Sequence, residues 1–258
     1  PPLPVQREIV RILDNFTELT AELTAELTAE LTARKQQYEY YRDALLNFGV
    51  WGGRTSDCYW RTIYPDGVEY KKLGDIGKVS MCKRIMKADT NMNAGIPFFK
   101  IGTFGKEPDA YITKEKYIEY KEKFSFPNQG DILISAAGTI GKTVIYDGNP
   151  AYYQDSNIVW LAHDESIVLN KYLFYCYQMK PWVAETGGTI ARLYNDNISK
   201  AKIPVPSMPV QERIVSILDR FDTLCNDLTA GLPAEIAARQ KQYEYYRDKL
   251  LTFKRKEA

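Results

Sequence analysis

Apolar residues recur every three or four positions along the N-terminal part of the chain. They are Ile9, Ile12, Leu13, Phe16, Leu19, Leu23, Leu27 and Leu31. This spacing is that of one helix face, and no glycine or proline interrupts the segment from Val5 to Phe48. We therefore predict a single helix of about 43 residues, ~60 Å long, after an extended Pro-rich lead at residues 1–4. So long a helix with so narrow an apolar stripe is typical of one half of a coiled coil.

The same pattern returns near the other end of the chain. Residues 209–253 align with residues 4–48 at a constant offset of 205 without a gap, and 28 of the 45 aligned positions are identical. Such an internal repeat indicates structural pseudo-symmetry. A second helix is therefore expected from Val210, and Gly231 and Pro233 predict a kink within it.

The first copy contains the tract TAELTAELTAEL at residues 20–31. Alanine, leucine and glutamate favour helix, so the tract predicts a stiff spacer. Each four-residue unit turns by ~400°, so successive leucines drift by ~40° around the helix. Leu224, Leu228, Leu232 and Ile236 of the second copy are also four apart, which predicts that the two helices drift together and pack on each other. The tract is either a low-complexity expansion of no consequence or, if domains that read DNA lie at both ends of the helix, a ruler in which each unit adds ~6 Å between them.

Between the repeats, short apolar or aromatic runs alternate with turn residues. Candidate strands are 68–73, 96–101, 132–135, 144–146 and 158–161, and candidate helices are 114–120 and 171–179. We predict an α+β fold with one globular mixed α/β domain, flanked by two long helices that form an antiparallel coiled coil. The expected domains are residues 1–48 (first long helix), 49–205 (globular domain) and 206–258 (second long helix).

Composition narrows the class of protein. The chain has 258 residues, of which 45% are hydrophobic and 26% charged, with a formal net charge of +1; this is typical of a globular protein. Cys58, Cys82, Cys176 and Cys225 lie far apart without zinc-site spacing, which favours buried thiols in a reduced cytoplasm. The lone histidine, His163, is expected to be structural. No apolar run is long enough to span a membrane, so we expect a cytoplasmic protein without membrane, metal or cofactor.

Three segments resemble catalytic motifs without meeting their requirements. Residues 136–143, AAGTIGKT, fit a relaxed phosphate-binding loop, but strand and turn residues follow them where such a loop needs a helix. Residues 149–152, NPAY, resemble an adenine methyltransferase motif that lacks its second proline. Asp155, Asp164 and Glu165 are near in sequence, yet nothing else resembles a nuclease cluster. We expect no catalytic residues in this chain.

Positive charge clusters in the globular domain. From Lys71 to Lys106 there are eight basic residues and two acidic ones. Basic residues interleaved with asparagine, threonine and aromatic residues suit phosphate contact and base-edge readout, and the glycines of a second polar loop at 186–189 favour close approach to a backbone. The candidate DNA-binding residues are Lys71, Lys72, Lys83, Arg84, Lys87, Lys100, Thr103, Lys106, Thr139, Lys142, Thr189 and Arg192. The alternative is an ordinary solvated surface.

The two copies of the repeat share the cluster YEYYRD, at residues 38–43 and 243–248. These clusters hold more aromatic surface than the seam of two helices buries, and aromatic residues and arginine are enriched at protein interfaces. The candidate partner-binding residues are Tyr38, Tyr41, Arg42, Tyr243, Tyr246 and Arg247. The alternative is packing within the chain.

The Pro-rich lead, the helix that starts PVQ, the TAEL tract and the segment GDIL…GTIGK at residues 130–142 together resemble the DNA specificity subunits of type I restriction-modification systems, close to their R124-like subgroup. The resemblance covers essentially the whole chain. It implies a non-catalytic subunit whose recognition domain reads one half of a split target in double-stranded DNA. It also implies that the paired helices dock DNA methyltransferase (modification) subunits, and that restriction, or motor, subunits complete the complex.

The chain departs from that family in one respect. The full subunit alternates two recognition domains with two conserved helices, whereas this chain runs helix, recognition domain, helix. The resemblance therefore implies a half-subunit, and we expect two copies to associate as a homodimer. From the residues alone, a non-catalytic coiled-coil scaffold whose middle domain binds a protein or a small ligand stays open as an alternative.

Overall fold

The computed structural model describes residues 1–48, 67–183, 192–226 and 231–253. The chain forms two compact units, Pro1–Arg42 with Ser216–Ala258, and Asp43–Val215. We call them the helical unit and the globular unit and describe each by itself. The Cys58 thiol, Leu228 and the polar loop at 186–189 with its candidate Thr189 lie outside the described residues.

The first repeat forms one helix, α1, which spans Leu3–Leu46 and is 44 residues long. The expected single helix is therefore confirmed. It begins earlier than predicted, because Pro4 lies in its first turn instead of in an extended lead. The first turn tolerates proline, since its amide nitrogens have no intrahelical partner.

The second repeat forms two helices, α7 at Met208–Asn226 and α8 at Leu232–Leu251. The sequence predicts a helix that is kinked at Gly231 and Pro233. The helix instead ends and a new helix begins there, so the position of the prediction is right but the continuous helix is wrong. Gly231 is the N-cap of α8 and Pro233 lies in its first turn. Proline at this position starts a helix well, because its fixed φ suits the first turn.

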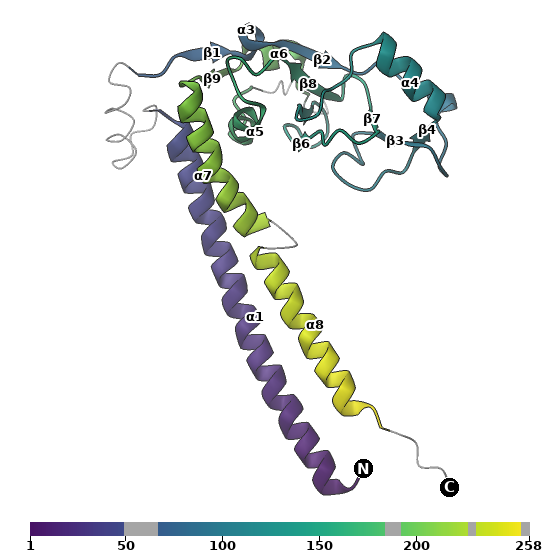
Figure 1. Cartoon of the computed structure of the whole chain (residues 1–258), viewed down its shortest axis with the longest axis vertical. Helices are drawn as coiled ribbons and strands as arrows, with labels where there is room; N and C mark the ends of the chain where they lie inside the picture. The colour runs from purple at the N-terminus through teal and green to yellow at the C-terminus, as the bar shows by residue number, and fades with distance from the viewer. Residues whose placement is uncertain (49–66, 184–191, 227–230, 254–258) are drawn as a thin grey trace. The chain divides into compact units, whose positions relative to one another are not determined.

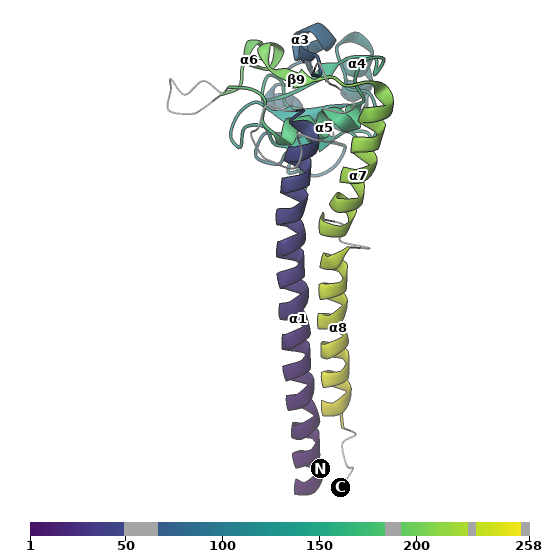
Figure 2. The same cartoon turned by 90° about the vertical axis from the view of Figure 1, so that its left-hand side faces the viewer.

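Helix α1 runs antiparallel to α8 and to the C-terminal part of α7 within the helical unit (Figures 1 and 2). Toward one end of the hairpin the rings of Phe16 and Tyr246 have centroids 5.6 Å apart. Toward the other, the ring of Tyr41 stacks on that of Phe221 at 5.5 Å. Residue numbers rise on one helix as they fall on the other, which confirms the expected antiparallel pairing.

The leucines spaced four residues apart do not all lie in the seam of this hairpin. Leu27 and its repeat equivalent Leu232 are buried, at 9% and 8% exposure, whereas Leu19 and its equivalent Leu224 are 62% and 37% exposed. A stripe with a period of four residues drifts around a helix whose period is ~3.6 residues. The drift carries the outer leucines of both copies out of the seam, at equivalent positions of the repeat.

The globular unit contains three small sheets. A four-stranded antiparallel sheet has the order β2-β8-β5-β6, and a three-stranded sheet has the order β4-β3-β7, with β3 and β7 parallel. A two-stranded antiparallel sheet joins β1 to β9. The strands are β1 Tyr70–Lys72, β2 Lys78–Met81, β3 Ile96–Phe99, β4 Tyr111–Ile112, β5 Ile132–Ser135, β6 Thr143–Ile145, β7 Tyr152–Tyr153, β8 Ile158–Ala162 and β9 Lys202–Pro204.

Short helices connect and cover these strands. They are α3 Leu73–Ile76, the 3-10 helix η1 Lys87–Asp89, α4 Lys114–Lys123, α5 Asn170–Gln178 and α6 Asn195–Lys200. Helices α4 and α5 lie where the sequence predicts them. The Thr113 side chain caps α4 by accepting a hydrogen bond of 3.2 Å from the Lys116 amide, which satisfies one of the free N–H groups of the first turn.

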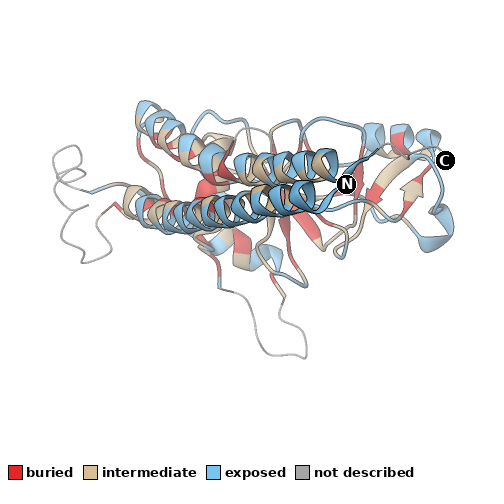
Figure 3. Ribbon diagram, turned by 90° about the horizontal axis from the view of Figure 1, so that it is seen from below, coloured by how far each residue is buried: buried red, intermediate tan, exposed pale blue. Residues whose placement is uncertain are grey.

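Aromatic residues dominate the core of the globular unit, and buried residues gather on its strands (Figure 3). Tyr152 and Trp160 are fully buried, and β5 is buried along its whole length. A strand covered on both faces reads as a continuous apolar run instead of an alternating one. This explains why the segment ILIS was recognisable from sequence.

The expected buried thiols are confirmed for Cys82, Cys176 and Cys225. Burial raises the pKa of Cys82 and of Cys176 to about 12. The His163 ring lies between two backbone carbonyl oxygens, with Nδ1 3.2 Å from that of Leu161 and Nε2 2.9 Å from that of Val168. These contacts support the structural role expected for this residue.

Candidate nucleic-acid interface

A groove of about 420 Å³ opens in the globular unit, lined by segments that follow β2, β3 and β7. Three of its lining residues are basic (Arg84, Lys87, Lys100), two are acidic (Asp109, Asp155) and four are neutral and polar (Thr90, Asn91, Gln154, Asn157). The three basic residues are all among the DNA-binding residues predicted from sequence. The groove is thus the place where the structure brings part of the predicted basic cluster together.

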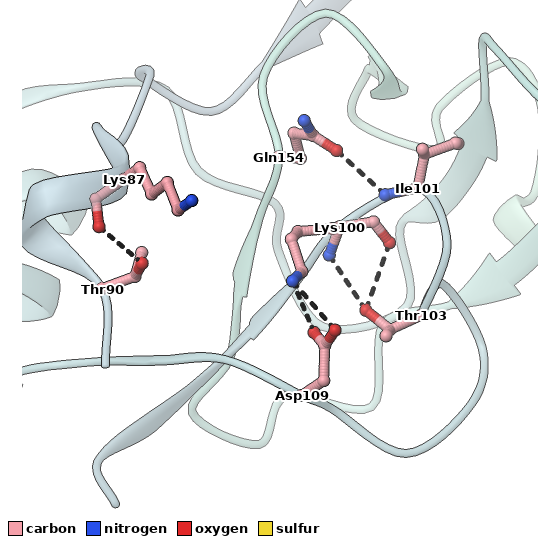
Figure 4. A network of polar contacts seen from close by, with 7 residues as sticks. All are labelled: Lys87, Thr90, Lys100, Ile101, Thr103, Asp109 and Gln154. Atoms are coloured by element: carbon pink, nitrogen blue, oxygen red, sulfur yellow. Dashed lines mark hydrogen bonds and ion pairs between the residues drawn. The ribbon is translucent and has the colours of Figure 1, made fainter. Parts of the chain in front are cut away.

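Lys100, which lines the groove, begins a turn at residues 100–103 (Figure 4). The Thr103 hydroxyl accepts a hydrogen bond of 3.1 Å from the Lys100 amide and donates one of 3.3 Å to the Lys100 carbonyl. The Lys100 ammonium is 2.8 Å and 2.9 Å from the two carboxylate oxygens of Asp109. Thr103, a candidate from sequence, therefore shapes the turn that carries Lys100.

Gln154 fixes this turn to the neighbouring strand. Its backbone N–H donates to the Phe99 carbonyl over 2.9 Å. Its side-chain oxygen accepts a hydrogen bond of 2.9 Å from the Ile101 backbone amide (Figure 4). Because Lys100 directly follows β3 and Gln154 directly follows β7, the parallel pairing of these two strands brings both residues to the groove.

The loop after β2 supplies two further basic residues. The Arg84 Nε donates a hydrogen bond of 2.7 Å to Asp155 Oδ2. In η1 the Lys87 carbonyl accepts a hydrogen bond of 2.8 Å from the Thr90 hydroxyl, and no carboxylate pairs with the Lys87 ammonium among the residues that the structure describes. Lys87 is therefore the groove cation whose charge is not already offset by a neighbour.

The other basic candidates from sequence do not line this groove. Lys71 and Lys72 lie on β1, where Lys71 pairs with Glu69 at 3.4 Å. The Lys83 ammonium lies over the Phe124 ring, 5.1 Å from its centroid. Lys106 lines a separate cavity of about 220 Å³. The basic residues that are clustered in sequence therefore do not all lie on one surface.

The remaining candidates form hydrogen bonds within the globular unit. The Lys142 ammonium donates hydrogen bonds of 2.6 Å and 3.4 Å to the carbonyls of Phe104 and Gly105. The Thr139 carbonyl accepts one of 2.5 Å from the Ser135 hydroxyl. Arg192 donates to the Ser156 hydroxyl over 3.0 Å, and so braces the segment between Asp155 and Asn157.

The segment that resembles a phosphate-binding loop is a β-hairpin turn. Strand β6 follows it and pairs antiparallel with β5, and Gly138 and Gly141 in the turn have positive φ angles of 65° and 77°. A phosphate cradle needs a helix N-terminus at this point, so the expectation that a strand follows the segment instead is confirmed. Among the described residues, no three His, Cys, Asp or Glu side chains converge as metal ligands, and no described helix is long and apolar enough to cross a membrane.

Six polar or acidic residues of the groove are not among the candidates predicted from sequence: Thr90, Asn91, Asp109, Gln154, Asp155 and Asn157. The candidates were predicted from clustered positive charge, which these six residues lack. A signal was present at Gln154–Asn157, where a run of polar residues directly follows the buried pair Tyr152–Tyr153. Polar residues at the end of a buried strand are a frequent source of binding groups.

Some residues of the two tyrosine clusters make contacts within the helical unit, and others are exposed. Tyr41 and Tyr246 pack against phenylalanines of the opposite helix, as described above, and the Tyr243 hydroxyl lies 3.0 Å from that of Thr17. Arg42 lies over the ring of buried Tyr38, with 5.8 Å to its centroid, and Arg247 pairs with Asp248 at 2.7 Å. Tyr40 and Tyr245, which are repeat equivalents outside the predicted set, are the most exposed tyrosines of the two clusters.

Comparison with known proteins gives a consistent result. Residues 65–238 match the family model described as the type I restriction modification DNA specificity domain. The chain is 57% identical over 257 residues to a Haemophilus influenzae protein provisionally described as the type I restriction enzyme specificity subunit S.HindORF215P, covering 98% of this chain and 63% of that protein. It is 37% identical to the Escherichia coli type I restriction enzyme EcoR124I/EcoR124II specificity subunit, covering 99% of this chain and 61% of that protein.

A solved structure also has a similar fold. The HsdS subunit from Thermoanaerobacter tengcongensis aligns with a TM-score of 0.60 over 97% of this chain and 58% of that chain, at 17% sequence identity. The chain thus spans about three fifths of the length of the curated relatives described above, at 63% and 61% of each.

Proposed function

Because the chain belongs to the type I restriction-modification DNA specificity family, we propose that it is a non-catalytic subunit that reads double-stranded DNA through the groove of its globular unit. The observation that carries this proposal is the groove's lining, which combines the Lys87 cation with the side-chain amides of Asn91 and Gln154. Cations that contact phosphates position a protein on a duplex, and amides that contact base edges supply specificity.

A binding experiment with the full chain tests this directly. Duplexes are selected from a randomised pool at physiological salt, and the selected duplex is compared with a scrambled one by fluorescence anisotropy. We expect a preference for the selected duplex and weaker binding by Lys87→Ala. The matched control is Lys123→Ala, which removes an exposed lysine of α4 that pairs with Glu119. If all duplexes bind equally, or if no duplex binds, the result favours the alternative function of a coiled-coil scaffold.

We further propose that the helical unit docks two modification subunits, and that restriction, or motor, subunits complete the complex. The support is the repeat itself: Tyr40 and Tyr245 present the same exposed side chain from equivalent positions on α1 and α8. Two equivalent surfaces suit two copies of one partner. Light scattering of the chain mixed with modification subunits tests this; the double variant Tyr40→Ala, Tyr245→Ala is expected to bind fewer copies.

The equivalence of the two repeat copies also suggests how a chain with one recognition domain could form a particle that reads both halves of a split target. In the globular unit, Gln211 is fully buried; its side chain accepts a hydrogen bond of 3.0 Å from the Leu169 amide and donates bonds of 2.9 Å to the Ile167 and Pro206 carbonyls. Its repeat equivalent on α1, Gln6, is exposed. The first copy of the repeat thus leaves exposed a side chain that the second copy buries against a globular unit.

We propose that the globular unit of a second copy covers this face, so that two chains read the two halves of one target. Light scattering of the full chain is expected to give two copies, and Gln6→Ala is expected to weaken the association. The matched control Gln36→Ala changes an exposed glutamine elsewhere on α1. A monomer both with and without modification subunits contradicts this arrangement.

A further inference from the structure

Two amide side chains in the groove have fixed orientations. The side-chain oxygen of Gln154 accepts a hydrogen bond from the Ile101 amide at 2.9 Å. The side-chain oxygen of Asn91 accepts two, from the amides of Asn93 at 3.0 Å and Ala94 at 3.1 Å. A backbone N–H bonds only to an acceptor, so each oxygen faces the protein and each NH₂ group is left for the groove.

Among the charged groups of the groove, too, acceptors are mostly bonded within the protein and donors are mostly left free. Both carboxylate oxygens of Asp109 contact the Lys100 ammonium, and Asp155 accepts from Arg84 Nε through Oδ2. Arg84 keeps both terminal nitrogens, and Lys87 keeps its ammonium, without a partner among the described residues. Among the described residues of the groove, the side-chain acceptors that receive no hydrogen bond from a described residue are Asp155 Oδ1 and the Thr90 oxygen, together with the Asn157 amide, which can turn either way.

Guanine and adenine present different groups at the major-groove edge, and a groove with more free donors than acceptors favours one of them. Guanine presents two adjacent acceptors, O6 and N7, whereas adenine presents the N7 acceptor beside the N6 donor. Glutamine and asparagine recognise adenine by donating and accepting at once. One lone pair of the Gln154 oxygen is already engaged by the Ile101 amide, whereas both hydrogens of its NH₂ group have no partner among the described residues, so Gln154 offers the groove donors before acceptors.

We propose that the groove reads a guanine, with Gln154 Nε2 and a neighbouring cation of Arg84 or Lys87 donating to O6 and N7, and that Gln154 discriminates against adenine at that position. This inference rests on the proposed function, because it assumes that the groove faces the major groove of DNA. The free Asp155 Oδ1 is consistent with it, since a carboxylate can accept from the N4 amino group of the paired cytosine.

The test compares the full chain with Gln154→Glu. Glutamate retains an oxygen for the Ile101 amide and changes only the outward group, from a donor to an acceptor. Because the added charge weakens all DNA binding, the readout is the ratio of affinities for guanine and adenine at each position of the selected duplex. We expect this ratio to fall about tenfold at one position. Asn93→Asp, which adds the same charge at an exposed loop residue, is expected to leave the ratio unchanged.

Modified bases separate failure of this inference from failure of the proposed function. At the position concerned, 7-deazaguanine removes N7 and is expected to weaken binding, whereas inosine keeps O6 and N7 and is expected to bind as guanine does. Specific binding that depends on Lys87 but tolerates 7-deazaguanine, or selects adenine there, overturns the guanine inference alone. Binding that is not sequence-specific, or does not depend on Lys87, overturns both.

Discussion

The ring of Phe16 packs on that of Tyr246 with centroids 5.6 Å apart, and the same pair recurs 205 residues on, as Phe221 with Tyr41 at 5.5 Å. The helical unit therefore has an approximate two-fold axis that exchanges α1 with the pair α7 and α8. Leu27 and Leu232, which are equivalent and both buried, lie near the middle of the hairpin. Internal symmetry of the sequence is thus realised as symmetry of packing.

The first prediction concerns these aromatic pairs. Phe16→Ala and Phe221→Ala should each lower the free energy of unfolding by about 1–2 kcal/mol, since each ring is only half-buried and loses one aromatic contact. Urea unfolding measures both. Tyr245→Ala, at an exposed position, should change stability by less than about 0.5 kcal/mol. A neutral result for either phenylalanine alone would argue against equivalent packing.

The second prediction compares leucines of the same stripe. Leu27→Ala should cost about 2–3 kcal/mol because it empties a buried position in the seam. Leu19→Ala, eight residues earlier on the same stripe, should cost less than about 0.5 kcal/mol because that side chain is largely exposed. Equal costs in thermal or urea unfolding would show that the four-residue stripe, not the 3.6-residue helix period, determines the seam.

The sequence predicted most of the fold wherever the pattern was local. The long helix, the strand Ile132–Ser135 and the helix over Lys114–Lys123 each follow from consecutive residues. Strand β2, KVSM, was not predicted because it pairs only at the edge of its sheet and is nowhere fully buried, so it lacks a strong apolar run. Strand β7 has only two residues, which is too short for any period to show.

The candidate site was predictable only in part. Charge clustering identified Arg84, Lys87 and Lys100, which the fold brings to one groove. It could not identify Asp155 as the partner of Arg84, because 71 residues separate the two in sequence. Nor could it tell that Lys71 and Lys106 lie outside the groove, since that depends on how the three sheets are arranged.

The third prediction concerns charge in the groove. Lys87→Ala should reduce the slope of log affinity against log salt by about one, as expected for one lost phosphate contact. Asp109→Asn should instead strengthen binding to all sequences, because it releases the Lys100 ammonium from a carboxylate. Anisotropy titrations at several salt concentrations measure both slopes. Weaker binding by Asp109→Asn would mean that the carboxylate, not the cation, faces the DNA.

The fourth prediction concerns the buried thiols. Burial raises the pKa of Cys82 and of Cys176 to about 12, so both should resist alkylation by iodoacetamide at pH 8 in the folded protein and react fully in urea. Peptide mass mapping distinguishes the individual cysteines.

The same shift has a consequence for stability. A raised folded pKa favours the neutral thiol, so its contribution is present below the unfolded pKa of about 8.5 and is lost as pH rises toward the folded value. The free energy of unfolding should therefore decline between about pH 9 and pH 12. Rapid alkylation of either cysteine in the native state at pH 8 would contradict the burial described.

The central claim is that the groove of the globular unit faces DNA, and photo-crosslinking tests it most directly. A benzoylphenylalanine is placed at Met92, an exposed residue that lines the groove, and separately at Tyr245, an exposed residue of α8. The account predicts that the Met92 variant crosslinks to the selected duplex and that the Tyr245 variant does not. Crosslinking from Tyr245 with none from Met92 would contradict it.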